Sequence, residues 1–197
     1  MAIQIGQKPS PTFQQPLELL SDCHRRIEMF LGALLLVTEQ ARGGTLNSQQ
    51  REALETALRY FREAAPKHTA DEEVSLFPRL RQLNPGATRD ALTKIKALEA
   101  DHEIASREHA TVEQLGQRWL KHNSLLPEDV TLLITTLTTL QQTYVRHIDI
   151  EDNDIFPLAS RILNMDQLAE VGREMAARRG QNSIPAWQNA KDASAGT

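Results

Sequence analysis

Two segments of the chain carry the same pair of polar residues at the same spacing. His68 precedes Glu72 by four positions, and His147 precedes Glu151 by four positions. Residues four apart on an α-helix are neighbours, with about 5–6 Å between their Cβ atoms, so each pair can direct an imidazole and a carboxylate at one point. Imidazole nitrogen and carboxylate oxygen suit iron, manganese or zinc rather than a soft copper(I) site.

Two isolated histidines, His24 and His102, lie on the apolar faces of two other periodic segments. Four segments would therefore each bury one histidine, and two of them would also bury a carboxylate. Burying such groups without partners costs several kcal/mol each, on the order of 2–7 kcal/mol for a neutral polar group. A metal centre would satisfy them directly, and a closed hydrogen-bond network is the alternative.

An internal duplication relates these residues to one another. A shift of 79 positions places the second segment on the fourth, and a shift of 78 places the first on the third. The aligned positions include His68 with His147, Glu72 with Glu151, Phe77-Pro78 with Phe156-Pro157, and His24 with His102. The chain is thus two copies of a helical hairpin, and two hairpins packed face to face have a pseudo-two-fold axis. We expect the four histidines to lie near this axis at similar depth.

Apolar residues recur at helical spacing in all four segments. The first ends at Gly43-Gly44, and the second begins near Ser48 and contains Pro66. Proline removes one hydrogen-bond donor from a helix, so Pro66 is predicted to kink the second segment. Phe77-Pro78 and Phe156-Pro157 are predicted to end the second and fourth segments.

The remaining boundaries follow from turn and cap residues. Asn84-Pro85-Gly86 is expected to form a loop, Thr88 to cap the third helix, and Pro127 to open the fourth. Four long helices with short loops predict an all-α fold, an antiparallel up-down-up-down four-helix bundle with a short C-terminal helix. The predicted division is an N-terminal arm at 1–16, the bundle at 17–160, the short helix at 161–179 and a flexible tail at 180–197.

Composition narrows the class of protein. The chain has 197 residues, a net charge of −4 and 40% hydrophobic residues, which is enough for one domain with a real core. The single cysteine, Cys23, excludes a disulfide framework or a cysteine-rich metal site. Mild acidity disfavours nucleic-acid binding. No apolar run approaches the ~18 residues of a membrane span, and no secretory signal is visible, so a cytoplasmic location is predicted.

Ligand counting favours two metal ions over one. If Glu72 and Glu151 both bridge, each ion receives two imidazole nitrogens and two carboxylate oxygens. A bridging oxide or hydroxide would make five ligands and leave one position per ion open to a small molecule. We therefore expect a pair of metal ions, with iron, manganese and zinc all open as candidates at this point.

The two repeated segments, His68-Thr-Ala-Asp-Glu72 and His147-Ile-Asp-Ile-Glu151, resemble the hemerythrin-like HHE cation-binding domain. The resemblance covers about residues 17–160 and implies a four-helix bundle around a non-haem di-iron centre. By residue matching, it implies the metal ligands His24, His68, Glu72, His102, His147 and Glu151. Family members include oxygen carriers, sensors of oxygen, nitric oxide or iron, and proteins linked to repair of damaged iron centres.

The ligand set is more similar to that of the iron-centre-repair branch than to that of the oxygen-carrying hemerythrins. Ser106 stands where the oxygen carriers have a fifth histidine. The oxygen carriers also have an aspartate five residues after the last histidine, which Asp152 could imitate as a substitute ligand, but Glu151 is the residue that matches its repeat partner Glu72. The repair branch usually has a further N-terminal domain with a cysteine, which is not seen in this sequence. The resemblance thus favours a stand-alone metal-binding domain.

Several residues near the expected centre have two interpretations. Glu28 follows His24 by four positions, but its repeat partner is Ser106, so it is expected to lie outside the ligand set. Asp71 and Glu73 either accept the outer N–H of a ligand histidine or form a solvated face. Tyr144 either hydrogen-bonds a metal-bound species or lines the entrance, or it simply packs, and His109 is a core or gate histidine. Cys23 is expected to point away from the face of His24, which disfavours a role in redox sensing.

Three functions remain open from the sequence. The leading hypothesis is a di-iron protein that binds oxygen, nitric oxide or peroxide for sensing, carriage or stress response. The second is iron storage, iron handling or iron-centre repair. The third is a metal-dependent redox enzyme, for which no substrate motif is visible. The protein partner is unknown.

Overall fold

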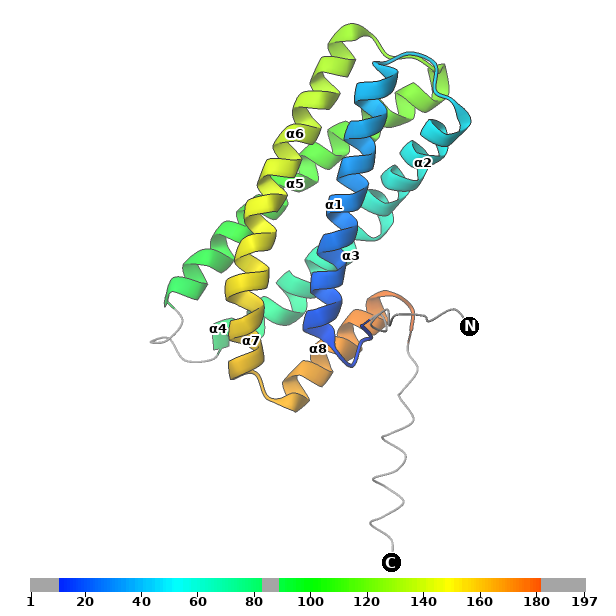
Figure 1. The fold of residues 1–197 in the computed structure, drawn as a ribbon. Helices are drawn as coiled ribbons and strands as arrows, with labels where there is room; N and C mark the ends of the chain where they lie inside the picture. Colours follow the sequence, from blue (N-terminus) through cyan, green and yellow to red (C-terminus); the bar gives the residue numbers. More distant parts are fainter. Residues whose placement is uncertain (1–10, 83–88, 182–197) are drawn as a thin grey trace, which may run out of the picture.

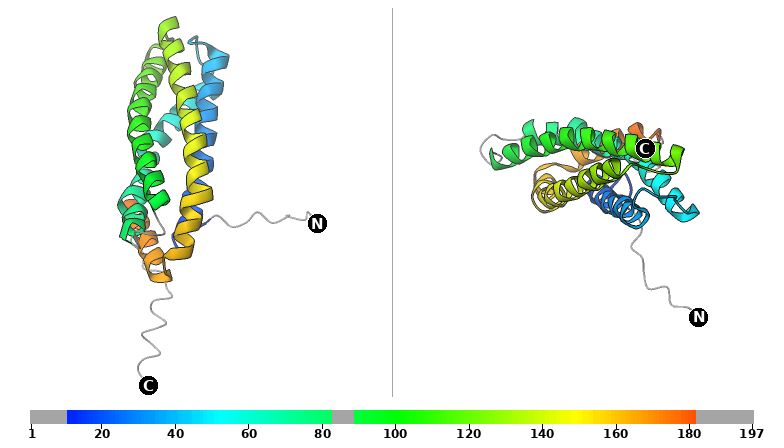
Figure 2. Two further views of the ribbon diagram at one scale, coloured as in Figure 1. Left: turned by 90° about the vertical axis from the view of Figure 1, so that its left-hand side faces the viewer. Right: turned by 90° about the horizontal axis from the view of Figure 1, so that it is seen from above.

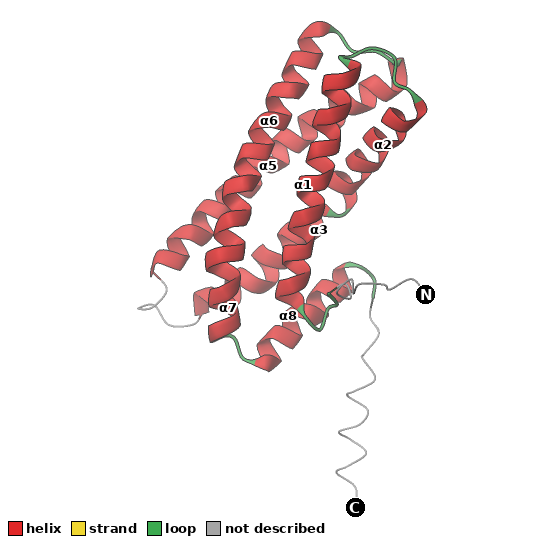
Figure 3. Ribbon diagram, in the orientation of Figure 1, coloured by secondary structure: helices red, strands yellow, loops and turns green. Residues whose placement is uncertain are grey.

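The computed structural model describes residues 11–82 and 89–181, and within these ranges all regular structure is helical (Figure 3). The elements are α1 (Pro16–Ala41), α2 (Ser48–Glu63), α3 (Ala65–Ala70), η1 (Asp71–Leu76), α4 (Phe77–Gln82), α5 (Arg89–His122), α6 (Pro127–Ile150), η2 (Glu151–Ile155), α7 (Phe156–Ile162) and α8 (Met165–Arg178). Here η marks a π-helical turn. Among the described residues, no helix is both long and apolar enough to cross a membrane.

Four antiparallel rods form the bundle (Figure 1). The first is α1, the second runs from α2 through α4, the third is α5, and the fourth runs from α6 through α7. Two further views show these rods following one long axis (Figure 2). The short helix α8 packs at the end of the bundle where α1 begins (Figure 1). The predicted all-α, up-down-up-down bundle with a short C-terminal helix is confirmed.

The prolines of the second and fourth rods have different effects. The kink predicted at Pro66 is present, because α2 ends at Glu63 and Pro66 lies in the first turn of α3. The prediction that Phe77-Pro78 and Phe156-Pro157 end their helices is wrong, since α4 and α7 continue through both. Each proline follows a π-helical turn, where the ladder changes from five-residue to four-residue spacing. Such a change accommodates a residue without a donor.

The end of the bundle opposite α8 is fixed by two loops that bind each other. Chain reversal after α1 uses the left-handed conformation at Arg42 (φ 48°) and Gly43 (φ 75°). The Gly43 carbonyl accepts a hydrogen bond from the Leu125 N–H, and the Gly44 carbonyl accepts one from the Trp119 indole, both at 2.8 Å. The helix stop predicted at Gly43-Gly44 is therefore present. The Asn84-Pro85-Gly86 loop and the Thr88 cap lie outside the described residues.

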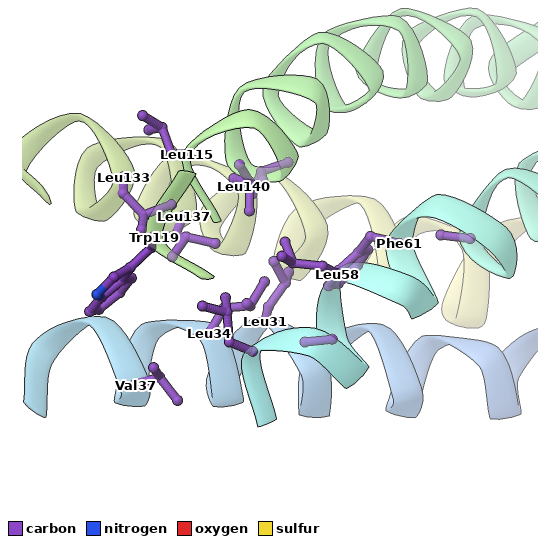
Figure 4. Close-up of a cluster of buried hydrophobic side chains, with 14 of the residues drawn as sticks. Leu31, Leu34, Val37, Leu58, Phe61, Leu115, Trp119, Leu133, Leu137 and Leu140 are labelled. Carbon is purple, nitrogen blue, oxygen red and sulfur yellow. The ribbon is translucent and has the colours of Figure 1, made fainter. Parts of the chain in front are cut away.

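Two separate apolar clusters fill the bundle. One packs the half nearest the two loops and includes Leu34, Leu58 and Trp119 (Figure 4). The other packs the half beside α8 and includes Phe77 and Leu98. In every rod, the residues that carry the predicted metal-binding groups lie between the stretches that build these two clusters. The bundle therefore has one polar layer between two apolar ones.

A buried ion-pair cluster fastens α8 to the second rod. Asp71 is fully buried and accepts hydrogen bonds from Arg178 at 2.8 Å and Arg179 at 2.7 Å. Gly172 of α8 touches the backbone of Phe13, and a Cβ added there would lie 1.9 Å from the Phe13 carbonyl oxygen. Helix α8 thus packs against the segment before α1 through Gly172, and the end of α8 binds the π-helical turn η1 through Asp71.

We predict that Asp71→Ala destabilises the protein by roughly 2–3 kcal/mol, because two arginines lose a buried partner. The loss is smaller than for a wholly buried pair, since the Arg178 and Arg179 side chains keep 20% and 21% of their exposure. Urea unfolding measures the change. The control is Asp154→Ala, which removes an exposed aspartate paired with Lys94. Equal stability of the two variants would contradict this role for Asp71.

Candidate metal centre

Six side chains meet in the polar layer between the two apolar clusters. They come from all four rods and are at most 8% exposed: His24, His68, Glu72, His102, His147 and Glu151. Their ligand atoms form two groups, and within each group all the atoms lie within 4.8 Å of one another. One group contains His24 and His68, the other contains His102 and His147, and both contain Glu72 and Glu151. The structure thus brings together every residue of the predicted ligand set.

The inward atoms of each group are in close contact. In the first group, Nε2 of His24 lies 3.0 Å from Oε2 of Glu151, and Nε2 of His68 lies 3.2 Å from Oε1 of Glu72. In the second, Nε2 of His147 lies 3.2 Å from Oε2 of Glu151, and Nε2 of His102 lies 3.4 Å from Oε2 of Glu72. Each glutamate therefore faces one histidine from each half of the repeat.

These contacts are not a closed hydrogen-bond network. Both oxygens of Glu72, both oxygens of Glu151 and Nε2 of His24 are buried without a hydrogen-bond partner. The Nε2 atoms of His102 and His147 face each other at 3.1 Å, where two lone pairs need a proton or a cation between them. Buried carboxylates are costly unless they are paired or bind a metal. The donor set, with nitrogen and oxygen atoms and no sulfur, fits metal ions in both groups.

Outer carboxylates orient two of the histidines. The Asp152 carboxylate accepts hydrogen bonds from Nδ1 of His24 at 3.2 Å and from the hydroxyl of Ser21 at 2.7 Å. The Glu73 carboxylate accepts a hydrogen bond from Nδ1 of His102 at 2.8 Å. Glu73 and Asp152 are repeat partners, and each reaches from its own hairpin to the other hairpin's histidine. A carboxylate on the outer nitrogen fixes the ring and leaves Nε2 free to bind a metal.

The other two histidines break this symmetry. Nδ1 of His147 lies 3.7 Å from the carboxylate of Asp101, which also accepts a hydrogen bond from Arg146. Nδ1 of His68 is buried and has no hydrogen-bond partner. The repeat partner of Asp101 is Cys23, so the residue type that faces His147 has no counterpart in the first hairpin. The two halves of the site thus differ in their outer contacts.

The raised pKa values of His24 and His102 reflect the excess of carboxylate charge around these two rings. Burial alone would lower the pKa of His24, but the carboxylates of Asp152, Glu151 and Glu72 raise it to about 12. Burial likewise opposes protonation of His102, and Glu72 is the main group that raises its pKa to about 9. Burial dominates at His68 and lowers its pKa. Without a metal, the site therefore holds protons in place of cations, and metal binding must displace them.

Other residues considered from the sequence lie outside the six-residue layer. Glu28 is exposed on α1 and belongs to neither group, as expected from its mismatch in the repeat. Nε2 of His109 shares a hydrogen bond with the Tyr144 hydroxyl at 3.0 Å, and Tyr144 lies about one helical turn before His147 on α6. Cys23 is buried, and burial raises the pKa of its thiol. His109, Tyr144 and Cys23 contribute no atom to the two groups.

Known proteins show the same domain. The family model described as Hemerythrin HHE cation binding domain matches residues 15–159, well over half of the chain. The chain belongs to the hemerythrin HHE cation-binding family. An uncharacterized protein of Haemophilus influenzae is 29% identical over 168 residues, which cover 85% of this chain and 92% of that relative.

Sequence reasoning about this HHE domain missed two features of the site. The π-helical turns begin at Asp71 and Glu151, so they coincide with the inward glutamates. Their signal in the sequence was a proline six residues after each glutamate, at the same repeat position. Asp152 was considered only as a substitute ligand, yet its alignment with Glu73 marks both as outer carboxylates.

We predict that Glu73→Gln and Asp152→Asn each weaken metal binding by about 10–100-fold, because each replaces the charged carboxylate that orients a histidine with a weaker, neutral acceptor. Competition with a chelator measures the affinity. The matched control is Asp154→Asn, an exposed carboxylate on the same turn as Asp152. Affinities equal to that of the control in both variants would show that these outer carboxylates do not support the centre.

Proposed function

We propose that this HHE domain holds a non-haem di-iron centre, with manganese or zinc as substitutes. One ion would be bound by His24 and His68, the other by His102 and His147. Glu72 and Glu151 would bridge both ions. The observation that carries the proposal is that the two four-residue groups share these two glutamates. The unpartnered carboxylate oxygens supply the negative charge that two cations would neutralise.

We further propose that the centre binds oxygen, nitric oxide or peroxide for sensing, carriage or stress response. Two nitrogen and two oxygen ligands per ion leave coordination positions for an oxide or hydroxide bridge and for a small ligand. When bound, iron supplies reversible redox chemistry at that position. The chain's own residues orient the histidines through Glu73 and Asp152. The flanking apolar clusters keep bulk water away from the layer.

Iron storage or handling is the second candidate, and one observation weighs against it. Cargo ions must enter and leave, whereas Glu72 and Glu151 are fully buried and the four histidines are 1–8% exposed. Each ion that left such a layer would have to be replaced by protons on the buried histidines. The geometry therefore favours a resident centre. Iron-centre repair and redox catalysis would use the same resident centre.

Metal stoichiometry tests the shared-ligand arrangement. We predict that Glu151→Ala lowers the content of both ions, whereas His68→Ala retains about one ion per chain, because His68 belongs to one group only. Both variants should also melt at a lower temperature, since metal binding couples to folding. Elemental analysis of protein purified without added metal gives the content.

The matched control for this experiment is His122→Ala, which removes an exposed histidine at the end of α5. It should retain the full content of the unmodified protein. Unchanged content in His68→Ala or Glu151→Ala would remove that residue from the ligand set. Equal partial loss in both variants would argue against a bridging glutamate.

Ligand binding at the metal is tested by spectroscopy. We predict that oxygen, azide or nitric oxide changes the visible absorption of the iron-loaded protein, because an open coordination position accepts the added ligand. Iron uptake and release without any stable adduct would instead support the storage alternative. The Glu151→Ala variant serves as the control, since it should show no such change.

A further inference from the structure

A cavity of about 340 Å³ lies between α2, α3 and α5 and reaches the candidate centre at His102. Its walls are largely apolar and include Leu58, Phe61 and Val112. A water-sized ligand such as a diatomic molecule needs only about 10–15 Å³ of such space. Cavities of roughly 300–1,000 Å³ are typical of sites for small organic molecules. The cavity is therefore much larger than the proposed diatomic ligands require.

Comparison of the two repeats explains why the cavity lies beside His102. Ala105 lines the cavity, and its repeat partner in α1 is Ile27. Ala65 also lines it, and its repeat partner in α6 is Tyr144. Small side chains thus replace large ones at two positions on one side of the pseudo-two-fold axis. The break between α2 and α3 falls on the same side of the cavity, since α3 begins at the lining residue Ala65.

The cavity contains one polar pair away from the centre. The Tyr144 hydroxyl and Nε2 of His109 are 3.0 Å apart, and the His109 ring stacks on Phe61 with centroids 4.3 Å apart. Burial lowers the pKa of His109 to about 4, so the ring is neutral near pH 7. Its Nδ1 is buried without a hydrogen-bond partner. Because that atom is enclosed, a guest must use the Tyr144 hydroxyl, which keeps a lone pair or its own proton free whichever way the shared proton lies.

The charges around the cavity cancel. Arg62 and Glu113 line it from α2 and α5 and pair with each other at 2.8 Å. Among the lining residues outside the candidate centre, these two carry the only formal charges at neutral pH. A charged guest would lose its hydration without gaining an unpaired counter-charge. An uncharged guest avoids this cost.

We infer that this cavity binds a small, uncharged organic molecule with one hydroxyl or carbonyl oxygen. The oxygen pairs with the Tyr144 hydroxyl, which His109 holds in place, and the apolar part fills the space beside His102. This inference deepens the proposed function, because the guest lies next to one half of the metal centre. Its binding energy comes from the cavity walls and the polar pair.

The test is a fluorescence titration of the full chain, as purified and after metal removal, with 2-naphthol as the probe. We expect saturable binding of one molecule per chain in both samples. The anion 2-naphthoate, which has a similar shape, should bind at least tenfold more weakly. Tyr144→Phe should weaken 2-naphthol about two- to tenfold, the value of one hydrogen bond, and leave naphthalene unaffected.

Two exposed alanines of α5 provide a matched pair of variants. Ala110→Trp places a large ring at a lining position and should weaken 2-naphthol at least tenfold, whereas Ala100→Trp lies outside the cavity and should not. Absence of saturable binding, equal effects of the two tryptophans, or equal affinity for 2-naphthoate would overturn the inference. A protein that binds 2-naphthol but never contains metal would instead overturn the proposed function and leave the cavity assignment standing.

Discussion

The dominant constraint in this molecule is the burial of two carboxylates side by side. Glu72 and Glu151 are fully buried, and none of their four oxygens has a hydrogen-bond partner. Their mutual repulsion and lost hydration would destabilise any bundle that lacked positive charge at this level. Histidines from all four rods surround them. The free energy of folding therefore depends on how the charge of this layer is balanced, by protons on the histidines or by a bound cation.

The local helix geometry serves that layer. Each π-helical turn begins at or next to an inward glutamate and widens the helix there, after which the chain resumes its α-helical course through a proline. The change of phase lets a rod present polar groups inward at one level and Leu76 or Ile155 at the next. Both apolar clusters can therefore form without displacing the polar layer between them.

Much of this arrangement could be predicted from the sequence, since periodicity and the 79-residue repeat identify four helices and one shared level. The six inward residues follow from the same repeat. The continuation of the helices past Pro78 and Pro157 could not, because proline normally ends a helix and only the wider turn removes the conflict. The pairing of Asp71 with Arg178 and Arg179 was also hidden, since it joins segments more than 100 residues apart without any periodic signal.

The crossed outer contacts have a consequence for the origin of the domain. Asp152 supports the histidine of the first hairpin, and Glu73 supports a histidine of the second. A lone ancestral hairpin would lack both its outer support and one shared glutamate, so only a pair of identical hairpins could assemble the layer. Within one polypeptide, by contrast, the two halves can differ. Asp101 opposite Cys23, and Tyr144 opposite Ala65, are differences that no symmetric pair could have carried.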